Sequence, residues 1–243
     1  MTKSFEPRCL GDSIAAEMEG SLPKELLDVF ERSTAADLVT VDGRGRPMAW
    51  SVQPSYDRRA VCIEVAAVPG EHDTHVALLF AREVPQPMVL VQGTAQVRET
   101  AMRVRPERVY VWERADLDAE PELYDSHVEE VRSAHNEEPE IGHAPPEGGA
   151  SAWDERLAAL GTTHERAVLA FVGPDGFPFA VSVPVRADRG AGVVRIGADP
   201  VGAPIETGVA CLCAAELRVR GDLEEDHGGW TLRPHAMVAA AEG

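Results

Sequence analysis

Two stretches decide the fold: LVTVDGRGRPMAWSV (residues 38–52) and LAFVGPDGFPFAVSV (residues 169–183). Each is an apolar run, a turn rich in Gly and Asp, and an alternating run that opens with proline. Matching positions lie a constant 131 residues apart, as Gly45 and Gly176 do. Two apolar runs around a glycine-containing turn are the pattern of a β-hairpin. The same hairpin at one spacing in both halves indicates an internal repeat.

Four further blocks recur in the same order in both halves, which extends the repeat over nearly the whole chain. They are an amphipathic helix pattern (26–30, opened by Ser21 and Pro23, and 151–160, with Ser151 and Asp154 near capping-box spacing), a β-branched stretch (61–64 and 193–196), a continuous apolar run (75–80 and 208–213, offset 133), and a final pair (91–97 and 219–225, offset 128). The continuous apolar run predicts a central strand that is buried on both faces. Each unit therefore has one helix and about six short strands, a content that fits a barrel better than a doubly wound sheet.

Between the units, an acidic connector carries prolines and ends in Glu147-Gly148-Gly149. This divides the chain into a first barrel unit (1–112), the connector (113–150) and a second, diverged unit (151–243). Within the connector, we expect residues 121–133 to form a helix with an acidic face. No chemistry is assigned to this segment.

The charge of the chain limits its partners. Its formal net charge is −18, from 41 acidic and 23 basic residues. A field of this sign repels nucleic acid and anionic membranes, so neither is an expected partner. The four cysteines form no CxxC pair, and Cys211 and Cys213 are expected in the core of a strand. Since no apolar stretch reaches about 18 residues and residues 1–20 lack a signal-peptide core, we expect a cytoplasmic protein.

Several of these stretches resemble the pyridoxamine 5'-phosphate oxidase-like family of flavin-binding split barrels. They are VDGRGRPMAWSV (41–52), CIEVA (62–66), HVALLF (75–80), VLVQGTAQV (89–97), PDGFPF (174–179) and VRGDL (219–223). The resemblance is to the tandem, actinobacterial type of member. It implies a mainly β (α+β) chain of two tandem six-stranded split β-barrels, related by an internal pseudo-twofold and flanked by helices. It also implies a groove between the barrels that holds FMN or a deazaflavin.

The resemblance further implies which side chains contact the cofactor. They are Trp50, Ser51 and Gln53 on one strand, Glu64 on the next, Gln92 and Thr94 on either side of Gly93, and Arg46 for the phosphate. The simpler interpretation is that these are outward polar positions of amphipathic strands, that Arg46 is a solvated turn residue, and that Gly93 is a bulge or close-approach glycine.

One departure from the family leaves two functions open. The segment 69–74, where relatives carry Lys or Arg, contains only Glu71, His72 and Asp73 as charged or titratable groups. The first hypothesis is an FMN- or deazaflavin-dependent oxidoreductase acting on an unknown small molecule. The alternative is a non-catalytic cofactor- or haem-binding protein, or a structural split-barrel protein, that has lost its phosphate-binding loop.

Histidine patterns add little to either hypothesis. His72 and His75 in HDTH form an HxxH pair in a loop, which by itself does not make a metal site, and no metal is expected. Haem bound through one of these histidines is a further possibility. The expected assembly is a monomer with pseudo-dimeric repeats or a homodimer.

Overall fold

The computed structural model describes residues 22–68, 73–81, 87–112, 120–125, 152–197, 202–226 and 229–238. The elements of the first half are α2 (Lys24–Arg32), β1 (Ala36–Val41), β2 (Pro47–Val52), β3 (Ser55–Asp57), β4 (Cys62–Ala66), β5 (His75–Phe80), β6 (Met88–Arg98), β7 (Ala101–Trp112) and β8 (Glu122–Asp125). Those of the second half are the 3-10 helix η1 (Glu155–Ala159), β9 (Arg166–Val172), β10 (Pro178–Asp188), β11 (Val193–Ile196), β12 (Gly208–Ala214), β13 (Leu217–Asp226) and β14 (Gly229–Met237). The predicted mainly β double barrel is confirmed.

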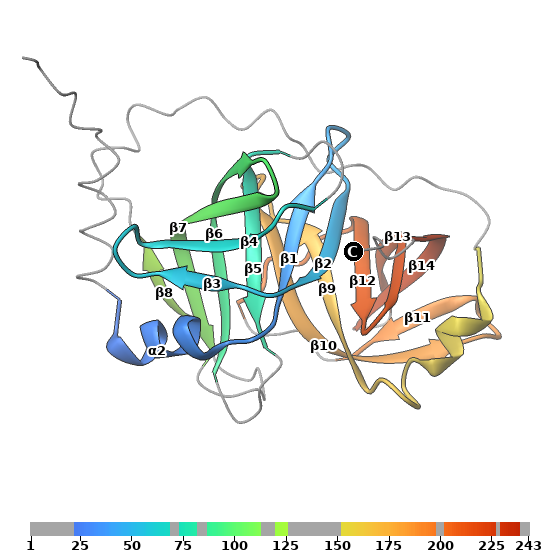
Figure 1. The fold of residues 1–243 in the computed structure, drawn as a ribbon. Helices are drawn as coiled ribbons and strands as arrows, with labels where there is room; N and C mark the ends of the chain where they lie inside the picture. The colour runs from blue at the N-terminus through green and yellow to red at the C-terminus, as the bar shows by residue number, and fades with distance from the viewer. Residues whose placement is uncertain are drawn as a thin grey trace, which may run out of the picture.

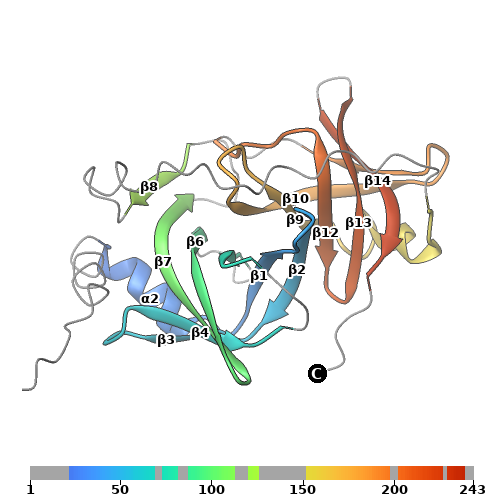
Figure 2. The ribbon, with the colours of Figure 1, turned by 90° about the horizontal axis from the view of Figure 1, so that it is seen from above.

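Both halves use the same antiparallel ladder, and they lie side by side (Figure 1). The first half is a curled sheet of order β2-β1-β5-β6-β7-β4-β3, with β8 paired to β7. The second half is a closed barrel of order β10-β11-β14-β13-β12-β9. Strands β1, β5, β6, β7 and β4 thus occupy the places of β9, β12, β13, β14 and β11. The view from above shows the curl of the first sheet, with α2 at its open side (Figure 2).

The repeat is exact down to single glycines. Gly93 and Gly221 each follow a register shift, where an added Cβ would lie 2.0 Å from the Arg105 carbonyl oxygen and 2.1 Å from that of Arg233. Only glycine permits so close an approach of two backbones, so the predicted bulge at Gly93 is confirmed. At the hairpin turns, Gly45 has φ 75° and Gly176 has φ 78°.

The structure corrects the alignment of two blocks. Leu78 pairs with Leu38, and the equivalent Leu169 pairs with Leu212, so the apolar run repeats at 134 residues rather than 133. The β-branched stretch is also displaced by one residue, since Ile63 is equivalent to Val194. A continuous apolar run gives no alternation that would fix its register, and a slip of one residue exchanges the faces of a strand.

The expected helices need correction as well. The first forms an α-helix at 24–32, around the predicted residues 26–30, but the second is only the 3-10 turn η1 within 151–160. Its N-cap is Asp154, whose side chain accepts a hydrogen bond from the Arg156 amide at 2.8 Å, whereas Ser151 lies outside the described residues. The connector helix expected at 121–133 is wrong at its start, because residues 122–125 form β8 on the edge of β7. Residues 126–133 are outside the described residues.

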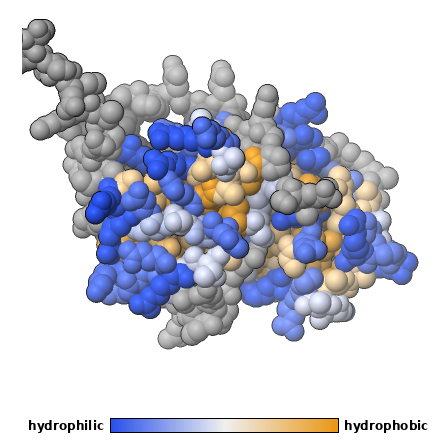
Figure 3. Space-filling model, in the orientation of Figure 1, coloured by the Kyte–Doolittle hydropathy of each residue, from blue (hydrophilic) through white to orange (hydrophobic). Residues whose placement is uncertain are grey.

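Alternation along the strands creates two hydrophobic cores. One fills the curl of the first sheet, where Phe30 of α2 packs against the rings of Tyr56 and Phe80. The other fills the closed barrel and continues across the outer face of β1, β2, β5 and β6. This second core joins the two halves, and Figure 3 shows apolar atoms in the middle of one face, between hydrophilic flanks. Cys211 and Cys213 are buried in it, as predicted. Among the described residues, none of the helices is long and apolar enough to cross a bilayer.

Candidate functional site: the seam between the barrels

The two halves meet along a seam that small side chains line on both sides. The buried residues are Val39, Ala49 and Ala77 on the first half and Ala170, Ala180 and Cys211 on the second, which are equivalent positions of the repeat. Small side chains allow two sheets to approach closely and bury their outer faces. Contacts across the seam are reciprocal, β2 against β12 and β10 against β5, as a pseudo-twofold axis requires.

Two side chains fasten the seam by bonding to strand-edge carbonyls of the opposite half. The Gln92 Nε2 atom donates to the Pro178 carbonyl oxygen at 2.9 Å, and the Arg218 Nε atom donates to the Ala49 carbonyl oxygen at 2.9 Å. Pro178 begins β10 and Ala49 lies in β2, which are equivalent strands. Each half therefore protects an exposed strand edge of the other, which would otherwise present unpaired backbone groups.

The hairpin of the second half closes one end of the seam. Phe177 packs between the His75 ring, with centroids 4.4 Å apart, and the Arg108 guanidinium, 4.6 Å from the Phe177 ring centre. Arg108 also forms an ion pair with Asp175. Burial acts to lower the pKa of Arg108, but the bond to Asp175 outweighs it, and the pKa is raised. This end is occupied by protein.

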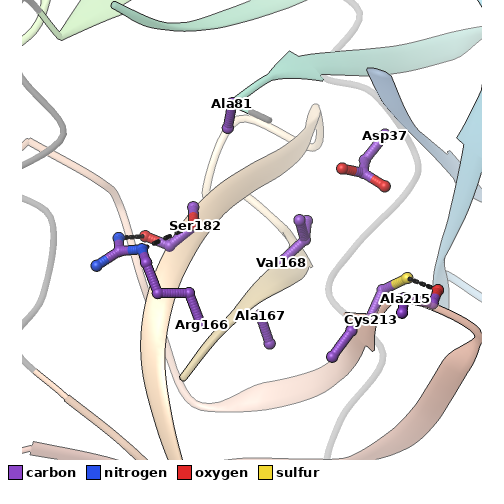
Figure 4. Close-up of a pocket in the computed structure, with 9 residues that line it drawn as sticks. Asp37, Ala81, Arg166, Ala167, Val168, Ser182, Cys213 and Ala215 are labelled. Atoms are coloured by element: carbon purple, nitrogen blue, oxygen red, sulfur yellow. Dashed lines mark hydrogen bonds between the residues drawn. The ribbon is translucent and has the colours of Figure 1, made fainter. Parts of the chain in front are cut away.

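A cleft of about 230 Å³ lies elsewhere on the seam (Figure 4). Its lining residues are Asp37, Ala81, Arg166, Ala167, Val168, Ser182, Cys213, Ala214 and Ala215. Asp37 and Val168 are equivalent in the repeat, and so are Ala81 and Ala215. Because both members of each pair line the cleft, it lies on the pseudo-twofold axis.

The polar groups of the cleft come from both halves. Asp37 is 1% exposed, and its Oδ1 atom accepts a hydrogen bond from the Ser51 hydroxyl at 3.3 Å. On the other half, Arg166 donates from Nη2 to the Ser182 carbonyl oxygen at 2.6 Å and from Nε to the Ser182 hydroxyl at 3.1 Å. Burial lowers the pKa of Arg166. The cleft thus places a buried carboxylate beside apolar walls, with a guanidinium at one edge.

The seven residues predicted for a cofactor do not line this cleft. Arg46 is bound to Asp42 of its own hairpin, and this bonding holds the pKa of Asp42 below its usual value against the opposing effect of burial. Glu64 pairs with the Arg103 Nε atom at 2.5 Å on the sheet away from the seam. Gln53 is exposed, and Thr94 lies opposite His75 in the ladder.

The other three predicted residues do reach the seam or its border. Trp50 donates from its indole nitrogen to Thr40 at 3.1 Å and is otherwise part of the first core. Gln92 is 1% exposed, and its Oε1 atom is buried without a hydrogen-bond partner. Ser51 bonds to Asp37 and so borders the cleft.

A flavin does not fit the described residues well. The seven predicted side chains do not converge on one cavity, and the cleft falls below the roughly 300–1,000 Å³ of pockets that enclose drug-sized ligands. The cofactor role of these residues therefore stays a prediction.

The described histidines have structural partners. The His75 Nδ1 atom lies 3.0 Å from Asp73, and the His235 Nε2 atom lies 2.9 Å from the buried Asp222. No group of three potential metal ligands occurs among the described residues. His72, His127, His135 and His143 lie outside them.

Sequence reasoning missed Asp37, Arg166 and Cys213 as cleft residues. One signal was available for Asp37, which stands where the repeat has Val168. A charged residue that replaces an apolar one in an otherwise matching strand marks a position with its own function.

No protein-family model matches the chain, and no curated protein matches it. Among solved structures, the chain is similar to a haem-binding protein from Mycobacterium smegmatis, with 8% identity and a TM-score of 0.32, over 98% of this chain and 93% of that one. A second solved chain matches with 16% identity and a TM-score of 0.32, over 47% of this chain and 95% of that one. The family resemblance of the sequence stretches is thus unconfirmed, and these similarities carry no argument about a ligand.

Proposed function

We propose that this protein binds a small molecule in the seam cleft, with the Asp37 carboxylate as the polar anchor, and that it needs no flavin to do so. The observation that carries the proposal is the near-complete burial of Asp37 at the cleft, where its counterpart in the repeat is Val168. Burying a carboxylate is costly, and the cost is offset when a ligand donates hydrogen bonds or a positive charge to it.

The cleft defines the class of ligand. At about 230 Å³, it holds a molecule smaller than a typical drug or cofactor. Asp37 favours an ammonium or another strong donor, and the apolar walls formed by Ala81, Val168 and Ala214 favour a short aliphatic part. A small aliphatic amine meets these demands.

The test compares ethanolamine with its neutral analogue ethylene glycol, by calorimetric titration and by thermal unfolding. We expect ethanolamine to bind and raise the Tm of the wild-type protein, and ethylene glycol to have no effect. Asp37→Asn keeps the shape of the side chain and should abolish the response. Glu64→Gln, a matched change outside the cleft, should leave it intact. An ethanolamine response that is absent, or that persists in Asp37→Asn, contradicts the proposal.

An FMN- or deazaflavin-dependent oxidoreductase is the second candidate, and Gln92 favours it. Its buried Oε1 atom is an unpartnered acceptor on the seam, and a flavin ring carries an N–H group that could bond to it. The absorption spectrum of the purified protein, followed by titration with FMN, a deazaflavin and haemin, tests this candidate. Tight FMN binding that Gln92→Leu weakens and Asp37→Asn leaves unchanged would support the oxidoreductase over the amine-binding protein.

A further inference from the structure

Arg218 is a buried cation without an acidic partner. It is 7% exposed, its Nε atom is used by the Ala49 carbonyl oxygen, and its Nη1 atom is buried without a hydrogen-bond partner. Within the part of the chain that the structure describes, no carboxylate lies within ion-pair distance of it. Acidic residues outnumber basic ones in this protein by 41 to 23, so a shortage of carboxylates does not explain this.

A second arginine lies beside the first. Arg220 is two residues further along β13, and its Nε atom is also buried and unpartnered. In the ladder with β12, Arg218 pairs with Cys213 and Arg220 pairs with Cys211. Paired and alternate residues of antiparallel strands share a face, so both guanidinium groups belong to the face of β13 that borders the seam.

The rest of the surroundings suits a bound anion. The Arg218 guanidinium lies over the Trp50 ring, 5.9 Å from its centre, which orients the group but leaves its charge uncompensated. Burial raises the pKa of the neighbouring Cys211 thiol, which keeps it neutral. The equivalent residues in the first half are Leu90 and Gln92, so the charge was introduced in one copy alone.

Two nearly buried guanidinium groups with unused donors are costly unless an anion binds between them. We propose that Arg218 and Arg220 form a binding site for a small oxyanion, a phosphate or a carboxylate group, at the border of the seam against Trp50. Guanidinium groups present forked donors that match both oxyanions. Arg218 does not line the cleft, so this site is independent of the proposed amine site.

The test uses the full chain and inorganic phosphate as the probe, with sodium acetate as the carboxylate arm and sodium chloride at equal ionic strength as the reference. Titration calorimetry and thermal unfolding should both report binding of phosphate or acetate, and the stronger arm identifies the anion. Arg218→Met keeps the packing volume and removes the charge, and it should weaken anion binding about tenfold or more. Arg220→Gln should weaken it as well. The exposed Arg156→Gln, on η1, is the matched control and should bind like the wild type.

The stability of the variant without anion separates a binding site from a structural bond. If the charge waits for an anion, Arg218→Met should unfold at the same or a higher temperature than the wild type in chloride. If Arg218 serves only to bond the Ala49 carbonyl group, Arg218→Met should lower the Tm and neither anion should bind the wild type, which would overturn the proposal. Failure of the ethanolamine test would not affect this result, because the variants and the probes differ.

Discussion

The second barrel closes and the first does not, although both use the same ladder of strands. In the second, β10 runs without a break from β9 to β11, and the Val185 amide donates to the Glu165 carbonyl oxygen at 3.0 Å. The residue equivalent to Val185 is Pro54, which has no N–H to donate. The corresponding strand is divided there into β2 and β3, on either side of Gln53-Pro54.

Proline by itself does not break the strand, because its position relative to the partner strand decides the outcome. Pro184 lies inside β10, one residue before Val185. Backbone N–H groups of successive residues point to opposite sides of a strand, so the nitrogen of Pro184 faces away from β9 and no ladder bond is lost. The comparison teaches that a shift of one residue in the position of a proline separates a closed barrel from a curled sheet.

The largest effect is expected at the two bulge glycines, which test whether both halves need the same close approach. Gly93→Ala and Gly221→Ala each place a Cβ about 2 Å from a backbone oxygen, which must move. Each should lower the free energy of unfolding by about 3 kcal/mol or more, measured by chemical denaturation. Gly43→Ala is the control, because nothing lies within 4 Å of its added Cβ. Equal stability of Gly93→Ala and Gly43→Ala would show that the close approach is not required.

A smaller effect is expected at the turn before β4 and β11, where the halves differ in strain. Val61 has φ 46° and its equivalent Gly192 has φ 68°. A β-branched residue in this region is strained, so Gly192→Val should cost about 1–3 kcal/mol in denaturation experiments. Val61→Gly relieves strain but loses a buried side chain, so it should change stability little. A neutral Gly192→Val would mean that this turn accommodates valine without strain in both halves.

Pro54→Val tests the origin of the break between β2 and β3. The new amide can donate to the carbonyl group of Thr34, the equivalent of Glu165. The gain of about 0.5–1.5 kcal/mol from this bond is offset by the greater flexibility of the unfolded chain without proline, so stability should change by about 0.5 kcal/mol or less. Hydrogen exchange is the measurement, and the amide at position 54 should exchange slowly. Rapid exchange there would show that something other than proline keeps the strands apart.

The smallest effect concerns the helix caps, where η1 has a charged cap and α2 begins after Pro23. Hydrogen bonds from the side chain and the backbone of Arg156 lower the pKa of Asp154 to about 2. A carboxylate with a lowered pKa stabilises the folded state fully above its unfolded pKa of about 3.9, and this contribution is lost as the pH falls towards 2. Asp154→Asn should therefore flatten the pH dependence of the Tm slightly between pH 4 and 2. An identical pH profile for the variant and the wild type would contradict the assignment.

The sequence by itself determined the repeat, the barrel class and the hairpins, because glycine and proline act through local backbone geometry. Gly45, Gly176 and Gly93 could be assigned from their neighbours in the chain. Registers within continuous apolar runs could not, since such runs show no alternation. The conversion of the expected second helix to a 3-10 turn also depended on packing rather than on pattern.

Only the tertiary structure decided which polar residues meet. Asp37 and Arg166 are far apart in the chain and belong to different halves, and they line one cleft because the two barrels pack on a common seam. The predicted cofactor residues were chosen along individual strands, and the fold distributes them between the seam, a hairpin and an outer sheet. Contacts across the seam join residues that are distant in sequence, and no local pattern encodes the direction in which two closed surfaces pack.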